Sequence, residues 1–374
     1  MVSRTRRIMA LAAPLVLTLA ACGGGGDPGD PAAEGGGGGG GGGDLEQITF
    51  LMPAPSIMQY HPWHIAQELG YFEDEGIEVE IVAGDGSSSI LQQILAGNAD
   101  VGAPSPGATM LASSTGRELV TYYQYLYSNI FTIAASEESG ITRMEDLKGK
   151  SIGVSDLAGG EVPLVRAALA QAGLQEGTDV TITPVGEGGA LTLEALRNGT
   201  VQAYSSSLFD EALVEASGVP MVDILPEELQ AFPSNSVVTT PERMEEKNEA
   251  LVGMMRAVAR AILFTETNPE AARSIAAEYA PEEFEDPAVV ESGWEAITTL
   301  RTIPDDLADE PRGMFDESDW EAYMGFLSQG SEEEGALQGP VDLDTLIDEQ
   351  YVEEINDFDE AAVIEQAETY EAGQ

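Results

Sequence analysis

Aromatic and imidazole side chains gather in one short stretch near the start of the chain. The loop predicted at 53–63, after the first strand, contains Tyr60, His61 and Trp63, and His64 lies in a helix predicted from Pro62, so both histidines of the 374-residue chain lie here. Tyr60 and Trp63 could stack on a flat solute, with His61 as a polar contact. In the other interpretation, Trp63 and His64 belong to the helix that follows and pack in the core. The sequence leaves both open.

Three serines stand where predicted strands pass into predicted helices. Ser87 and Ser88 open a helix that is predicted to run to Ala96, and Ser105 follows a short buried strand. Hydroxyl and amide groups at a helix start suit a carboxylate, a sulfonate or a carbonyl of a solute. Ordinary capping of the helix is the other interpretation, and both roles can hold at once.

Tyrosines alternate with other residues from 122 to 127. About half of such a set faces a core, because side chains alternate along a strand. We expect Tyr127, with Ser128 and Asn129 beside it, to be the tyrosine that contacts a solute.

Glycines and acids follow two later strands. Gly159 and Gly160 allow a ligand to approach the backbone closely. Glu161 lies in the same loop, as does Asp156, and these carboxyls disfavour an anionic solute unless they point away. Asp210 could pair with an amine or a ring N–H, or it could cap the helix predicted at 211–216. The sequence does not decide between these two roles.

Motifs for covalent or metal chemistry are missing from the sequence. It has no phosphate-binding loop, no metal-ligand spacing and no nucleophile elbow, and Cys22 is its only cysteine. An intramolecular disulfide and a cysteine metal cluster are therefore impossible. We expect a binding protein that uses no cofactor and no metal, rather than an enzyme.

Alternating strands and helices must position these residues. Predicted strands at 48–52, 77–82, 100–103 and 119–127 alternate with helices, and a second block from 144 to 204 repeats the pattern. Predicted helices dominate from 241 to 356. Alternation of this kind predicts an α/β fold with parallel sheets and a site at the carboxyl ends of the strands.

The first 45 residues read as a targeting segment and a tether. Residues 1–21 have a positive head and a short apolar stretch, and Leu19-Ala-Ala-Cys22 resembles a bacterial lipobox. Residues 22–45 are mostly glycine, which is typical of a flexible linker. We expect an extracytoplasmic protein anchored to the membrane through a lipid on Cys22. A plain secretory signal with an incidental cysteine is the alternative.

Acidic residues dominate the charge. The chain has 66 Asp and Glu against 16 Lys and Arg, which gives a formal net charge of −50. This balance argues against nucleic acid and against docking on anionic lipid through a basic patch. It predicts an acidic, solvated surface suited to high salt, and it opposes the entry of a strongly anionic ligand.

Four segments, in order, carry a resemblance to a known family. Residues 66–80, 86–102, 144–154 and 191–203 are similar to recurring segments of substrate-binding proteins of ABC importers, for example "DLKGKSIGV" at 146–154. The tail from Pro340 also looks like that family. The resemblance is to the branch that binds thiamine-pyrimidine precursors, sulfonates or taurine, and nitrate.

The resemblance implies a bilobed type II periplasmic-binding-protein fold, α/β, with two parallel-rich sheets flanked by helices. Lobe one would be 46–132 plus 239–374, and lobe two 133–238. A hinge would let the lobes close on a solute, and the partners would be ABC permease subunits and, through the anchor, the membrane. We expect a monomer.

The same resemblance implies candidate solutes. A thiamine-precursor-like pyrimidine is the first expectation, and sulfonate, taurine, nitrate or another small solute is the second. A pyrimidine-synthesising enzyme on the same fold is the alternative of another class. It would need a lysine and several His or Cys at a metal-bearing site, and this chain has only two His and one Cys.

Overall fold

The computed structural model describes residues 45–226, 229–329 and 337–371. The predicted signal peptide (1–21), Cys22 and all of the predicted tether except Leu45 lie outside these residues. Within the described ranges, no helix has the length and apolar character that crossing a membrane requires.

The first sheet has five strands: β1 (Glu46–Met52), β2 (Ile77–Ala83), β3 (Val101–Gly102), β4 (Val120–Gln124) and β10 (Ser236–Thr239). Their order is β2-β1-β3-β10-β4, with β1 parallel to β2 and β3, and β10 antiparallel to β3 and β4. The helices of this part of the chain are α1 (Ile57–Glu68), α2 (Tyr71–Asp74), α3 (Ser87–Leu95) and α4 (Pro106–Ser114). The loops after parallel strands meet at one edge of such a sheet.

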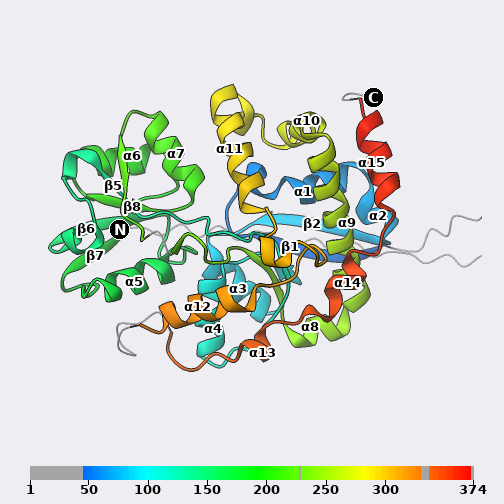
Figure 1. The fold of residues 1–374 in the computed structure, drawn as a ribbon, viewed down its shortest axis with the longest axis horizontal. Coiled ribbons are helices and arrows are strands. Elements are labelled where there is room, and N and C mark those ends of the chain that lie inside the picture. Colours follow the sequence, from blue (N-terminus) through cyan, green and yellow to red (C-terminus); the bar gives the residue numbers. More distant parts are fainter. Residues whose placement is uncertain (1–44, 227–228, 330–336, 372–374) are drawn as a thin grey trace, which may run out of the picture. The chain divides into compact units, whose positions relative to one another are not determined.

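The second sheet repeats this arrangement with β5 (Ala134–Ser136), β6 (Lys150–Val154), β7 (Val180–Pro184), β8 (Ala203–Ser205) and β9 (Met221–Asp223). Its order is β7-β6-β8-β5-β9, with β6 parallel to β7 and β8, and β5 antiparallel to β8 and β9. The helices here are α5 (Val162–Gln171), α6 (Ala190–Arg197) and α7 (Leu208–Ala216). Figure 1 shows this group in green at the left. The expected α/β class with two sheets flanked by helices is confirmed, but the sheets are mixed rather than parallel-rich, since each has two parallel and two antiparallel strand pairs.

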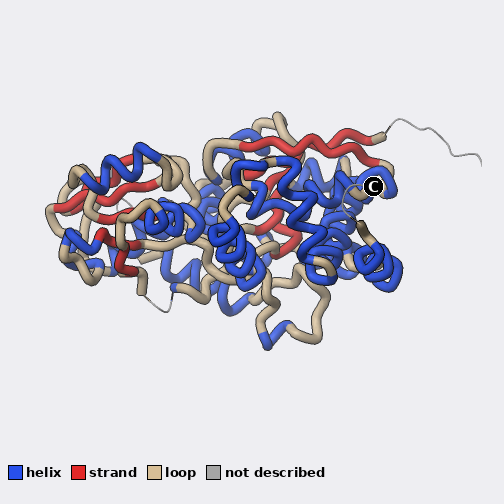
Figure 2. The backbone as a smooth tube through the Cα atoms, turned by 90° about the horizontal axis from the view of Figure 1, so that it is seen from above, coloured by secondary structure: helices blue, strands red, loops and turns tan. Residues whose placement is uncertain are grey.

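The tail is helical: α8 (Pro241–Glu246), α9 (Asn248–Thr267), α10 (Pro269–Tyr279), α11 (Pro287–Leu300), α12 (Glu317–Leu327), α13 (Leu343–Leu346), α14 (Val352–Ile355) and α15 (Glu360–Thr369). The tail also has the single 3₁₀ turns η4 (Pro281–Phe284), η5 (Asp305–Leu307) and η6 (Glu349–Tyr351). Two further 3₁₀ turns, η1 (Glu137–Ser139) and η2 (Met144–Leu147), lie between β5 and β6. The first sheet with α1–α4 and the second sheet with α5–α7 are called the two sheet groups below. Two tail helices contact both groups: α11 packs on α1 and α7, and α12 packs on α4 and α5. Figure 2 shows helices around the strands of both groups.

Two stretches of chain, 125–133 and 224–235, connect the sheets, and they are hydrogen-bonded to each other. The N–H groups of Tyr125 and Leu126 donate to the Asn235 carbonyl at 3.2 and 3.0 Å, and the Ser234 N–H donates to the Leu126 carbonyl at 3.0 Å. Gln124 Nε2 also donates to Leu126 and Ser234 carbonyls. Paired crossings of this kind are what a hinge between two lobes requires.

The position of strand β10 affects where lobe two ends and the chain returns to lobe one. The sequence boundary at 238/239 falls inside β10, whose residues pair with β3 and β4 of the first sheet. We propose lobes that follow the sheets, so that the return to lobe one comes before Ser236 rather than at residue 239.

The stretch expected as a loop at 53–63 is largely helix. Ser56 caps α1 by accepting a hydrogen bond from the Gln59 N–H, and α1 begins at Ile57. Pro62 lies inside α1 and has no N–H for the carbonyl of Met58, and the helix kinks at Tyr60. His61 Nδ1 lies 2.8 Å from the Met58 carbonyl and replaces the missing donor. A histidine next to the proline therefore satisfies the Met58 carbonyl at the kink.

Candidate functional site

A cleft of about 1660 Å³ lies where the two sheet groups and α11 meet. Its walls come from the loops after β1 and β2, the loops after β6, β7 and β8, and the segment that contains η4 and α11. The lining residues fall within 53–59, 83–92, 130–131, 155–161, 186–187, 206–216 and 282–296, together with Asn235. Each sheet contributes the carboxyl ends of its parallel strands, which is where the topology predicts a site.

The charged residues of the cleft lining are all acidic. Of the described residues that line the cleft, none is Lys, Arg or His, and ten are acidic: Asp85, Asp156, Glu161, Glu187, Asp210, Glu215, Glu282, Glu283, Glu285 and Asp286. A cleft with this lining attracts cations and repels anions, because low-dielectric walls strengthen the field of its charges.

Glu161 is the most deeply buried of these carboxyls, with 2% of its surface exposed. Its Oε1 accepts hydrogen bonds from the N–H and the hydroxyl of Ser155, at 2.8 and 2.5 Å. Burial raises the pKa of Glu161 to about 7, although the Ser155 hydrogen bonds oppose that shift. Glu161 is therefore a carboxyl that changes charge near neutral pH.

Asp210 and Glu187 add charge to the same wall. Asp210 accepts hydrogen bonds from the hydroxyls of Ser206 and Ser207 at 2.6 and 2.7 Å. Burial raises the pKa of Asp210, and the serine hydroxyls work in the other direction. Burial also raises the pKa of Glu187, and the charge of Asp210 adds to this. Three carboxyls with raised pKa values thus face one side of the cleft.

Apolar contacts come from Phe131, Phe209 and Met58, which all line the cleft. Phe131 precedes the second sheet, and Phe209 lies in α7. Aromatic rings of this kind offer a flat solute a stacking surface, whereas the carboxyls suit its N–H groups or a positive charge.

Ser87, Ser105 and Gly160 meet where the two sheet groups touch. The Ser105 N–H donates to Ser87 Oγ at 3.0 Å, and Ser105 Oγ donates to the Gly160 carbonyl at 3.1 Å. The Ser88 N–H donates to the Ala158 carbonyl at 3.0 Å. Position 160 has no room for a side chain, because a Cβ there would lie 2.7 Å from both Phe131 Cζ and Ser87 Oγ.

The sequence-predicted residues divide into two sets. Five of them line the cleft: Ser87, Gly159, Gly160, Glu161 and Asp210. The others lie outside its lining: Tyr60, His61, Trp63, Ser88, Ser105 and Tyr127. Ser88 and Ser105 contribute instead to the contact between the two groups.

The aromatic residues of α1 pack in the core. Trp63 is fully buried and stacks on Phe50, with ring centroids 4.4 Å apart. Tyr60 is also fully buried, but its hydroxyl accepts hydrogen bonds from Gln59 and Asn235, which line the cleft. Trp63 is therefore a core residue, as the second interpretation expected. Tyr60 lies in the core as well, and its hydroxyl holds two side chains of the cleft lining in place.

The side chains of His61 and Tyr127 also contact other parts of the protein. His61 is fully buried and stacks on Trp294 of α11 at 4.4 Å. Burial lowers the pKa of His61 well below its usual range, with a contribution from Arg301. The Tyr127 hydroxyl accepts a hydrogen bond from the Gly313 N–H at 2.7 Å. Side-chain alternation could not reveal these partners, because Trp294 and Gly313 lie far away along the chain.

Sequence reasoning did not single out Phe131, Phe209, Glu187 or the acidic run 282–286 as site residues. The run Glu282-Glu-Phe-Glu-Asp286 follows Pro281 and is visible in the sequence. It enters the cleft only because α11 folds back over α1, and local patterns carry no signal for that contact.

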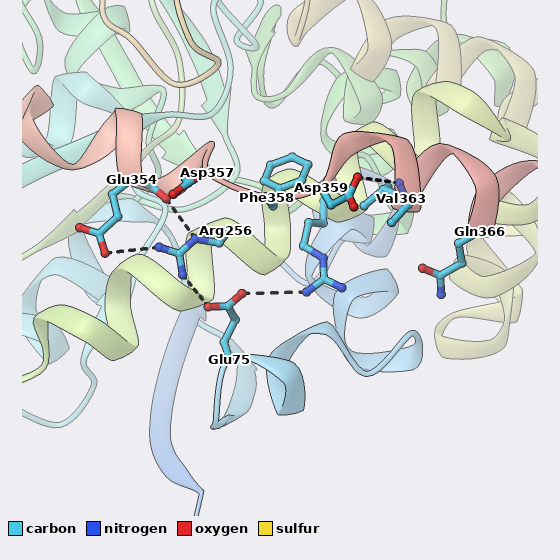
Figure 3. A pocket seen from close by; sticks show the side chains of 10 residues that line it. Glu75, Arg256, Glu354, Asp357, Phe358, Asp359, Val363 and Gln366 are labelled. Atoms are coloured by element: carbon cyan, nitrogen blue, oxygen red, sulfur yellow. Dashed lines mark hydrogen bonds and ion pairs between the residues drawn. The ribbon is translucent and has the colours of Figure 1, made fainter. Parts of the chain in front are cut away.

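A second, smaller hollow of about 540 Å³ lies between α2, α9, α14 and α15. Arg256 lies there between Glu75 and Glu354, at 2.6 and 3.4 Å (Figure 3). Arg260 pairs with Asp74 at 2.9 Å. Because these guanidinium groups already have carboxylate partners, this hollow is a structural ion-pair network. In the described part of the chain, no group of three or more His, Cys, Asp or Glu side chains could hold a metal ion.

Comparison with known proteins identifies a matching family. Residues 58–272, more than half of the 374-residue chain, match the profile of the family described as NMT1/THI5 like. The riboflavin-binding protein RibY of Chloroflexus aurantiacus is 24% identical over 246 residues, which is 64% of this chain and 68% of that protein. The 4-amino-5-hydroxymethyl-2-methylpyrimidine phosphate synthase of Schizosaccharomyces pombe is 31% identical over 107 residues, 29% of this chain and 31% of that enzyme.

Solved structures show the same fold. A protein from Bordetella bronchiseptica superposes with a TM-score of 0.69 at 22% identity, covering 84% of this chain and 98% of its own. The alkanesulfonate-binding protein SsuA from Xanthomonas axonopodis pv. citri gives a TM-score of 0.57 at 14% identity, covering 79% and 98%. The expected bilobed periplasmic-binding-protein fold is confirmed.

Proposed function

Because this chain belongs to the NMT1/THI5-like family, we propose that it is the extracytoplasmic solute-binding component of an ABC importer. Its two lobes close on a small organic solute and release it to permease subunits. The observation that carries this proposal is the cleft itself, which both sheet groups and α11 line, across a pair of hydrogen-bonded crossings. Binding and closure, rather than covalent chemistry, are its mechanism.

The solute that we propose is a flat nitrogen heterocycle, neutral or positively charged, with a thiamine-precursor-like pyrimidine as the first candidate. Phe131 and Phe209 supply stacking surfaces, and the carboxyls of Glu161 and Asp210 suit amino or ring N–H groups. Riboflavin, named for the Chloroflexus relative, is also a flat nitrogen heterocycle. Sulfonate, taurine and nitrate are the second candidates, and the absence of Lys, Arg and His from the described cleft lining counts against them.

Catalysis of pyrimidine synthesis is the alternative of another class. The Schizosaccharomyces enzyme matches only 29% of this chain. A metal-bearing synthase site would need several histidines, and His61 and His64 are both buried in α1, outside the cleft lining. These positions support binding without chemistry.

Membrane attachment through Cys22 completes the proposal. A lipid on Cys22 and a glycine-rich tether to residue 45 would hold a monomeric binding protein near its permease. The partners are thus a small solute, the permease subunits and the membrane.

A solute screen tests the proposal. The purified protein is melted with pyrimidines, riboflavin, organic amines, sulfonates and nitrate, and the hits are titrated calorimetrically. A true solute at a hundredfold excess over its dissociation constant stabilises the fold by about 2.7 kcal/mol. We expect a heterocycle to raise the melting temperature, and sulfonate and nitrate to leave it unchanged. No shift with any solute class would contradict the transport function.

A further inference from the structure

The carboxylate of Glu283 lies on the N-terminus of α1. Its Oε1 accepts the Ile57 N–H and its Oε2 accepts the Met58 N–H, both at 2.8 Å, and Ser56 Oγ lies 3.4 Å from Oε2. Glu283 belongs to η4, which is 226 residues away from Ile57 along the chain. Ser56, Met58 and Glu283 all line the cleft.

Two N–H groups on two oxygens are the arrangement by which a helix start holds an oxyanion. The first N–H groups of a helix have no partner within it, and the helix dipole adds a partial positive charge there. Sulfate, phosphate and carboxylate groups bind such positions readily. In this protein the anion at the start of the 12-residue helix α1 is a side chain of the same chain.

We propose that Glu283 is a specificity-determining residue: it occupies the oxyanion position at the N-terminus of α1 and so excludes anionic solutes from the cleft. This inference rests on the proposed function, since it concerns which solutes the same cleft admits. Glu283 acts in two ways. It takes the amides that an oxyanion would use, and it places a negative charge where that oxyanion would lie.

Neighbouring groups make the effect specific to Glu283. Glu285 lines the same cleft and carries the same charge, but among the described residues it accepts no hydrogen bond from α1. Asp286 accepts from the Ala288 N–H at 2.9 Å and thus caps its own helix α11. Removal of Glu285 therefore changes the field in the cleft without freeing the amides of Ile57 and Met58.

The test compares E283A with E285A and with the unmodified protein. Methanesulfonate is titrated into each by calorimetry, at an ionic strength held constant with NaCl. We expect E283A to bind methanesulfonate at least about tenfold more tightly than either of the other two. Equal affinities for E283A and E285A would overturn the proposal, because the charge alone would then explain any gain.

E283Q keeps the test decisive if E283A does not fold. The glutamine amide retains one acceptor oxygen for the α1 amides but has no negative charge, so methanesulfonate can displace it. We expect E283Q to gain affinity over E285Q, by less than E283A gains over E285A. If E283Q matches E285Q, the proposal is wrong.

The two proposals fail separately. If the unmodified protein binds no heterocycle but E283A gains methanesulfonate affinity, the proposed function fails and the role of Glu283 stands. If a heterocycle binds and E283A gains nothing, the reverse holds.

Discussion

At the scale of single residues, the chain places its own carboxyls at helix starts that face the cleft. Glu161 is the N-cap residue of α5, Asp210 lies in the first turn of α7, and Glu283 covers the start of α1. Helix starts favour negative charge, so each carboxyl is partly compensated while it makes the cleft acidic. The ligand selectivity that we propose follows from these three positions.

Glu161 gives a pH-dependent prediction. The folded protein holds a proton on this carboxyl up to pH of about 7, because burial raises its pKa from 4.5. The unfolded chain releases that proton near 4.5, so the folded state binds more protons in between, and stability falls as pH rises from 4.5 to 7. We expect Glu161→Gln to remove a loss on the order of 3 kcal/mol. Urea unfolding of both proteins at pH 5 and pH 8 measures it.

Glu282→Gln is the control for this experiment, since Glu282 is an exposed carboxyl of the same cleft. It should keep the unmodified pH dependence. The same drop in stability between pH 5 and pH 8 in Glu161→Gln and in the unmodified protein would show that burial of Glu161 does not set its charge.

At the scale of elements, the α3–α4 region contacts the loop before α5, and we propose that this contact forms when the lobes close. Ser105 donates to the Gly160 carbonyl, and Ser88 donates to the Ala158 carbonyl, so backbone of one group meets the other directly. Such a contact tolerates no added volume where atoms already touch. The loop after β6 therefore needs glycine for contact with the protein, in addition to any contact with a solute.

Gly160→Ala tests this element contact. The new methyl group would meet Phe131 and Ser87 at 2.7 Å, so the loop before α5 must shift away from them. Overpacking of this kind costs about 1–3 kcal/mol, and in the closure that we propose this cost weighs against the closed state. We expect small-angle X-ray scattering to show a larger radius of gyration, and solute affinity to fall by about 5- to 150-fold.

Gly189→Ala is the matched control, because a Cβ at Gly189 would meet no atom within 4 Å and its φ is −82°. It should scatter like the unmodified protein. An unchanged radius of gyration in Gly160→Ala, together with unchanged affinity, would contradict closure through this contact.

At the scale of the whole molecule, the net charge of −50 coexists with a cleft that has its own acidic lining. Several of the basic side chains are used in ion pairs, such as Arg256 with Glu75 and Lys247 with Asp100. The surplus acids shape the long-range field, which opposes anions before they reach the cleft. Surface charge and cleft charge thus act in the same direction.

Attachment to the membrane is a prediction for the whole chain. Lipidation of Cys22 would hold the protein at the membrane, and a single cysteine leaves no other thiol to carry the lipid. We expect Cys22→Ser, expressed in a bacterial host, to move the protein from the membrane fraction into the soluble extracytoplasmic fraction. Fractionation and immunoblotting measure this, with Cys22→Ala as a second variant. Membrane retention of both variants would refute the lipobox.

Much of the fold was predictable because its signals are local. The strand Ile77–Ala83 follows from apolar alternation, and the paired βα blocks follow from repeated strand-helix alternation. Ser87, Gly159, Gly160, Glu161 and Asp210 line the cleft because loops after parallel strands converge. The helical nature of residues 57–61 was missed, because Pro62 is typical of a helix start and the partner of the Met58 carbonyl, His61 Nδ1, is not visible in a local pattern.

By itself, then, the sequence determined the α/β class, the acidic character and the loops that surround the site, because periodicity, charge and strand endings are properties of short segments. Only the tertiary structure decided which side chains face the cleft. Trp63 turned into the core against Phe50, and Glu283 reached α1 from 226 residues away. Contacts at such separation arise from how whole elements pack, which no local pattern encodes.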